Sequence, residues 1–157
     1  MNSVMPKYME QLRRVRRMLD RIERNKGRSV DDYGDDVWSF FQNCWHLKDW
    51  IGKDSSVPLD KAAILKFVRK SQPLKICSDL ANCTKHLEFD DKHEPWVDAK
   101  PSHSNITITP GESSTVEYLI DPGTGAKQDA LDLARKCVAV MGAFSRCPRS
   151  SYAIDQA

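Results

Sequence analysis

Three hydrogen-bonding side chains near the middle of the chain recur with helical spacing. Asp79, Asn82 and His86 fall on one side of the helix that the surrounding apolar residues predict. An imidazole held by a neighbouring amide or carboxylate can donate or accept a proton near neutral pH, so these residues are candidates for a catalytic site centred on His86. The same spacing is typical of a structural hydrogen-bond network between two helices. The sequence leaves both interpretations open.

Other polar residues are candidates for binding a ligand or a partner. Asn43 and His46 lie about one turn apart on a second expected helix that is otherwise rich in aromatic side chains. Lys85 falls on a different face from His86, so we expect it to contact solvent or a phosphate group. These residues define a polar patch whose role the sequence alone does not determine.

The first segment of the chain is strongly basic. Residues 1–28 contain nine Lys and Arg, including Arg13 and Arg17, against three Asp and Glu. Such an excess of positive charge would attract nucleic acid or an acidic protein surface. A solvated helix face with no binding role has the same composition, and this simpler interpretation also stays open.

The cysteines indicate no metal site by their spacing. Cys83 and His86 are three positions apart and Cys44 and His46 lie in another helix, but paired zinc-binding motifs are absent. Most of the five cysteines occupy apolar helical positions, as small hydrophobic residues do, and their odd number indicates reduced thiols. The chain also lacks the glycine-rich and catalytic motifs of nucleotide-binding proteins, hydrolases and zincins. We therefore expect neither a metal nor a cofactor.

Composition and periodicity predict a single, mainly α-helical domain. The chain has 157 residues, 40% hydrophobic and 29% charged, and no apolar run long enough for a membrane span, so we expect a cytoplasmic protein. An apolar stripe should face the core of the first helix, with Arg13, Arg17 and Arg24 exposed opposite it. The stripe consists of Tyr8, Leu12, Val15, Leu19 and Ile22.

The remaining elements follow from caps, prolines and periodicity. We expect a bundle of four or five helices in residues 1–145, a loop over 90–104, a β-hairpin over about 104–120 and a flexible tail over 146–157. After the first helix, the helices should start near residues 32–35, 59, 73 and 122–125, the last one capped by Thr124 or Asp121, and should end near residues 51, 70, 89 and 144.

Residues 82–89 resemble the signature of the HEPN superfamily, whose members are helical bundles that usually dimerise. Many members are metal-independent ribonucleases of toxin–antitoxin, CRISPR and anti-phage systems. Their signature is an Arg, a polar residue and a His four to six positions after the Arg, often followed by an aromatic residue. Here Asn82, His86 and Phe89 match the polar residue, the His and the aromatic residue, while Leu80 and Ala81 stand where the Arg is expected.

The chain is also similar, over residues 35–145, to short bacterial proteins of uncharacterised function that share its Phe-Phe-x-Asn-Cys-x-His-Leu-Lys-Asp-Trp segment. Because the missing Arg would bind the scissile phosphate, we expect a non-catalytic or weakly active HEPN-like module. It would bind a partner protein or nucleic acid, in a defence or toxin–antitoxin context, and would form a homodimer. The alternative is a metal-independent endoribonuclease that uses His86.

Overall fold

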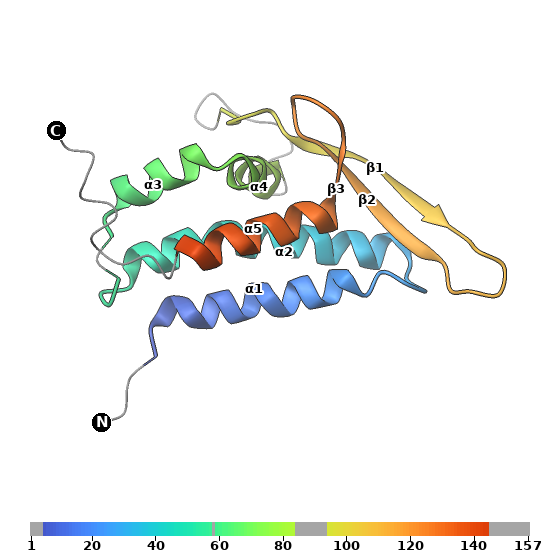
Figure 1. Ribbon diagram of the computed structural model, residues 1–157, viewed down its shortest axis with the longest axis horizontal. Coiled ribbons are helices and arrows are strands. Elements are labelled where there is room, and N and C mark those ends of the chain that lie inside the picture. Colours follow the sequence, from blue (N-terminus) through green and yellow to red (C-terminus); the bar gives the residue numbers. More distant parts are fainter. Residues whose placement is uncertain (1–4, 58, 84–93, 145–157) are drawn as a thin grey trace.

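The computed structural model describes residues 5–57, 59–83 and 94–144 of the chain (Figure 1). Within these ranges the chain forms five helices and a three-stranded antiparallel sheet, so the expected mainly α architecture is confirmed. No helix in the same ranges is long and apolar enough to cross a membrane. The helices are α1 (Lys7–Glu23), α2 (Val30–Lys53), α3 (Lys61–Lys70), α4 (Gln72–Cys83) and α5 (Ala130–Phe144), and the strands are β1 (Lys100–Thr107), β2 (Thr115–Asp121) and β3 (Gln128–Asp129).

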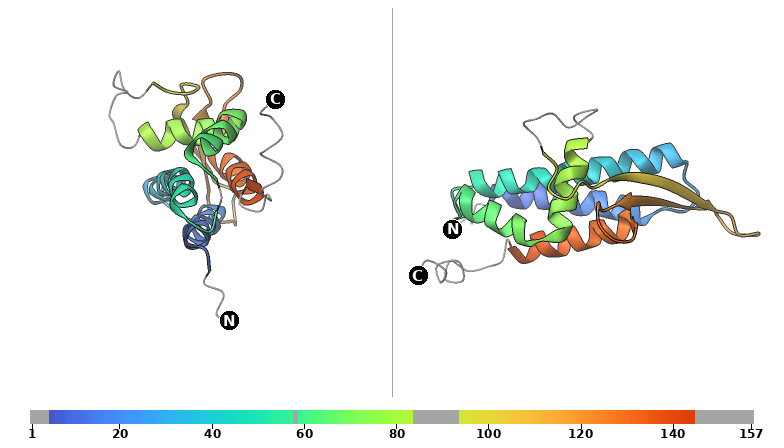
Figure 2. Two further views of the ribbon diagram at one scale, coloured as in Figure 1. Left: turned by 90° about the vertical axis from the view of Figure 1, so that its left-hand side faces the viewer. Right: turned by 90° about the horizontal axis from the view of Figure 1, so that it is seen from above.

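The apolar stripe predicted for the first helix faces the core. Tyr8, Leu12, Val15 and Ile22 of α1 are buried, and Leu19 is half-buried. Because only one face of an amphipathic helix can be covered by its neighbours, the charged residues between them are left outside. Seen end-on, α2 and α5 lie side by side, with α1 on one side of them and α3 and α4 on the other (Figure 2).

The second helix is the central element of the bundle. α2 contacts α1, α4 and α5, and its Phe40 and Phe41 are fully buried. It starts at Val30, before the expected start near residue 32, because the Ser29 hydroxyl accepts the backbone N–H of Asp32 at 3.1 Å and caps the helix. Its tryptophans, Trp38, Trp45 and Trp50, are half-buried within one chain. Dimerisation stays a prediction.

A carboxylate that follows α2 caps the N-terminus of α1. Asp54 accepts the backbone N–H of Tyr8 at 3.0 Å, while Pro6, the residue before α1, makes no side-chain cap. Asp54 also accepts the Ser56 hydroxyl at 2.6 Å and the Ser56 backbone N–H at 3.0 Å. The Ser56 hydroxyl lowers the pKa of Asp54 most, and the backbone N–H groups lower it further, although burial opposes them.

We expect Asp54→Ala to lower the free energy of unfolding by about 1–2 kcal/mol at pH 7, as loss of a helix cap does. Since the pKa is lower in the folded state, the carboxylate stabilises the fold fully above its unfolded pKa, and this contribution is lost as the pH falls through the folded pKa. The free energies of unfolding of wild type and variant, measured in urea, should therefore approach one another at acidic pH. A difference in free energy of unfolding that stays constant with pH would contradict the capping role of Asp54. The control is Asp35→Ala, which removes an exposed carboxylate.

The third and fourth helices form a short pair. α3 starts at Lys61, two residues later than expected, because the Asp60 side chain accepts the backbone N–H of Ala63 at 2.7 Å and sets the first turn. At the start of α4, the Ser71 hydroxyl accepts the backbone N–H of Leu74 at 3.4 Å. The predicted extension of this helix toward residue 89 lies outside the described residues, as does the predicted tail over 146–157.

The expected hairpin is part of a larger sheet. β1 and β2 pair antiparallel from Lys100 opposite Asp121 to Thr107 opposite Thr115, and β3 pairs with β2. The expected start of the last helix near residues 122–125 was wrong, because β3 comes first and α5 starts only at Ala130. The expectation of a loop was therefore wrong for residues 100–104. Charge and prolines suggested that loop, but Pro101 lies on an edge strand beside an irregularity in the register, which is where strands tolerate proline.

The connection between α1 and α2 is joined to this sheet. Lys26 pairs with Thr115, the backbone N–H of Gly27 donates to Ser114 at 2.7 Å, and the backbone N–H of Val116 donates to Asn25 at 3.1 Å. Gly27 has a φ of 64°, a conformation that glycine adopts without strain. The connection between α1 and α2 and the start of β2 therefore stabilise one another.

Candidate functional site

The outward face of α1 carries three aligned arginines. Arg13, Arg17 and Arg24 are all exposed, as the sequence predicted. At 100° per residue Arg13 and Arg17 fall within about 40° of one another around the helix, and Arg24 is its C-terminal cap residue. At 1.5 Å per residue they extend over about 16 Å, with Arg24 directly after the last helical residue. We call these three residues the arginine row.

Neighbouring arginines have partners within the fold. Arg21 and Arg28 bind the buried Asp36 of α2 at 2.6 and 2.7 Å, and Arg14 donates to the Gln11 side chain at 2.9 Å. By contrast, no member of the arginine row forms an ion pair with another residue in the part of the chain that the structure describes. Arg21 joins α1 to α2 through Asp36, and the charge of the arginine row remains open to solvent or to a ligand.

Asn43, one of the predicted binding residues, stabilises the packing of α1 on α2. The Gln11 side chain donates to its backbone oxygen at 2.9 Å and to its side-chain oxygen at 3.2 Å. The side-chain amide of Asn43 donates in turn to the Ser39 carbonyl at 2.9 Å. These contacts give Asn43 a structural role, whether or not it also contacts a ligand.

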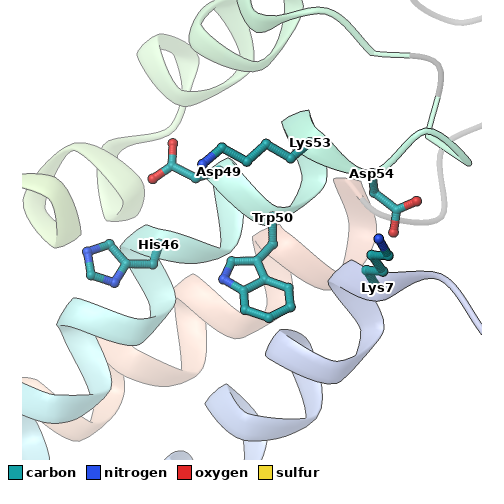
Figure 3. Close-up of a pocket in the computed structure, with 6 residues that line it drawn as sticks. All are labelled: Lys7, His46, Asp49, Trp50, Lys53 and Asp54. Carbon is teal, nitrogen blue, oxygen red and sulfur yellow. The ribbon is translucent and has the colours of Figure 1, made fainter.

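His46 lines a shallow pocket of about 280 Å³ beside the N-terminus of α1 (Figure 3). The charges around it are mixed. Two of its carboxylates are already engaged, since Asp54 caps α1 and Asp49 binds Lys48 at 2.6 Å. The cations, the imidazole and the indole could contact a small anion, but two carboxylates in the same wall oppose it. The lining residues are Lys7, His46, Asp49, Trp50, Lys53 and Asp54.

Asp79 is fully buried and binds the chain that leads into β1. Its carboxylate accepts the backbone N–H groups of Trp96, Val97 and Ala99 at 2.7, 2.9 and 3.1 Å. A carboxylate that satisfies three backbone donors anchors a loop, and no face of it opens to solvent. This geometry favours the structural interpretation of Asp79 over the catalytic one.

The other members of the predicted catalytic group are only partly placed. Asn82 is half-buried in the last turn of α4. Lys85 and His86 lie outside the described residues, so the structure does not test the grouping of His86 with Asn82 and Asp79. The proton-transfer role of His86 stays a prediction.

Sequence analysis missed a cluster of cysteines. Cys44 of α2, Cys77 of α4 and Cys137 of α5 are buried, and their sulfurs all lie within 4.8 Å of one another. Motif searches look for ligands close together in sequence, whereas each sulfur here comes from a different helix. The only signal was that each cysteine lies on the apolar side of its helix. Cys44 belongs to this cluster, whereas His46 and Cys83 do not, and His86 lies outside the described residues.

Comparisons with models of protein families, with curated proteins and with solved structures gave no match. The HEPN resemblance in residues 82–89 is therefore a proposal, and the functional argument depends on the geometry of the described residues.

Proposed function

We propose that this chain is a non-catalytic, HEPN-like helical module that binds single-stranded RNA through the arginine row. The observation that supports this is the alignment of Arg13, Arg17 and Arg24 on the outward face of α1, without an acidic partner among the described residues. A guanidinium is permanently charged and binds phosphate through two parallel hydrogen bonds. Such a row suits a polymer whose negative charges repeat along a line. The resemblance of residues 82–89 makes RNA the expected polymer.

The position of α1 supports the same proposal. It is the outermost helix on its side of the bundle, and the ion pair of its Arg21 with Asp36 joins it to α2 (Figure 2). A rigid helix loses little conformational freedom when a ligand binds. In the cytoplasmic homodimer that we also propose, two rows would act together and raise the affinity for a longer strand. A defence or toxin–antitoxin setting remains part of the proposal.

The test is the binding of labelled single-stranded RNA, followed by fluorescence anisotropy over a range of salt concentrations. We expect the triple variant Arg13→Gln, Arg17→Gln and Arg24→Gln to bind much more weakly. Each lost phosphate contact should reduce the slope of log K against log salt by about 0.7, or by about 2 for all three.

The matched control removes the same charge elsewhere. Lys61, Lys66 and Lys70 are exposed on α3, so their replacement by Gln changes the net charge equally without touching α1. Equal losses of RNA affinity in the two triple variants would show that binding depends on net charge and not on the arginine row. Absence of RNA binding at low salt, together with binding of an acidic protein that depends on the arginine row, would favour a protein partner.

The same RNA samples test the ribonuclease alternative. We expect the strand to stay intact in the presence of EDTA, because the Arg expected in the family signature is absent. Cleavage that resists EDTA and disappears in a folded His86→Ala variant would establish the enzyme instead.

A further inference from the structure

Three buried thiols meet where α2, α4 and α5 pack together. Cys44 is 1% exposed, and Cys77 and Cys137 are 0% exposed. Their sulfurs lie within 4.8 Å of one another, and all three residues belong to the hydrophobic core. All three are free cysteines rather than members of a disulfide.

Two of the three thiols donate hydrogen bonds to backbone carbonyls. The Cys77 thiol donates to the Phe41 carbonyl at 3.5 Å, and the Cys137 thiol donates to the Pro73 carbonyl at 3.4 Å. Burial raises the pKa of Cys77, and hydrogen bonding with Cys44 raises that of Cys137. An ion that replaces all three protons must form strong bonds to sulfur.

The three sulfurs leave a place for one ion. When three atoms lie within 4.8 Å of one another, some point lies no more than about 2.8 Å from all of them, close to the ~2.3 Å of a zinc–thiolate bond. No fourth His, Cys, Asp or Glu joins the cluster in the described part of the chain. Structural zinc sites have four ligands, so a three-coordinate ion fits better.

Charge decides which three-coordinate ion suits a dry core. Three thiolates give a net charge of −1 with a divalent ion and −2 with monovalent copper, and a net charge buried among apolar side chains is unfavourable. A trivalent ion gives a neutral complex. Lys136, whose charge lowers the pKa of Cys137, is itself exposed and so offsets little of a buried charge.

We propose that Cys44, Cys77 and Cys137 form a three-thiolate site for trivalent arsenic, supplied as arsenite. Arsenous acid, As(OH)₃, reacts with three S–H groups to give three As–S bonds and three water molecules. No electron is transferred and no charge is created in the core. Because the sulfurs are buried, the ion enters when the helices open locally, and binding is slow compared with a surface thiol.

The test uses the reduced full-length protein and sodium arsenite. We expect mass spectrometry to show one arsenic atom per chain, with loss of three protons, and X-ray absorption to show arsenic bound to three sulfurs. Cys77→Ser should abolish the adduct. The double variant Cys83→Ser and Cys147→Ser should retain it, since Cys83 is half-buried outside the cluster and Cys147 is the remaining cysteine.

Three results would overturn the proposal: no adduct, arsenic bound to two sulfurs, or an adduct that survives Cys77→Ser. If Cys77→Ser fails to fold, the number of sulfurs around arsenic in the native protein decides alone. A parallel sample with zinc sulfate should bind no zinc at the three cysteines. Stoichiometric binding of zinc to these cysteines would show that the core accepts a divalent ion, and it would refute the proposal that only a neutral complex is favoured.

Discussion

Asp79→Ala should lower the free energy of unfolding by roughly 3–5 kcal/mol, because it leaves three backbone donors without their acceptor and each unsatisfied donor costs about 1–3 kcal/mol. The donors are the N–H groups of Trp96, Val97 and Ala99. Water can reach the first two, which belong to half-buried residues, so the three losses should not add fully. Urea unfolding followed by circular dichroism would measure the difference.

Asn82→Ala is the matched control, since Asn82 lies one turn further along α4 and is only half-buried. We expect it to cost less than about 1 kcal/mol, as most substitutions away from buried networks do. Asp79→Asn should fall between the two, because an amide keeps one acceptor oxygen but presents N–H groups to the remaining donors. Wild-type stability in Asp79→Ala would refute the anchoring role.

The second large effect concerns the turn that packs against the same segment. Gly123 has a φ of 78°, and a Cβ placed there would overlap the carbonyl oxygen of Val97. The colliding atom belongs to the backbone that Asp79 holds, so it cannot move aside without breaking those hydrogen bonds. We expect Gly123→Ala to cost roughly 4 kcal/mol or more, in the range of exceptional single substitutions.

Gly125 separates the collision from the backbone strain. Its φ of 83° is almost the same, yet a Cβ there would meet nothing within 4 Å. Gly125→Ala should therefore cost only the roughly 1–2 kcal/mol of placing an L-residue in the left-handed region. The melting temperatures of the two variants, measured under one condition, give the comparison. Equal values would show that the Val97 carbonyl moves aside to admit the Cβ.

The parts of the fold that depend on local pattern were predictable. The stripe from Tyr8 to Ile22 repeats with helical period, so its buried face and the exposed arginine row follow from the sequence alone. α2 starts two residues before the expected position, directly after its cap residue Ser29. Periodicity reports the middle of a helix more reliably than its ends.

Contacts between distant segments were not predictable in the same way. Asp79 resembled a catalytic residue because the sequence does not show that backbone N–H groups 17 to 20 positions away would occupy its oxygens. The three-cysteine cluster was hidden for a related reason, since helix packing brings together sulfurs that no spacing rule connects. Strand β1 was missed at its start because pairing with β2 outweighed the local signal of Pro101.

The pairing of Lys26 with Thr115 also implies an order of folding. The neighbouring hydrogen bond joins Asn25 and Val116, which are 91 positions apart, whereas α1 and α2 follow one another directly. Local contacts close small loops and form quickly, while distant ones must first overcome the entropy of a long loop. The α1–α2 pair should therefore form early, and docking of the hairpin should be a late step. During synthesis both helices leave the ribosome before β2 is made. The connection between α1 and α2 is therefore exposed until the sheet can pair with it.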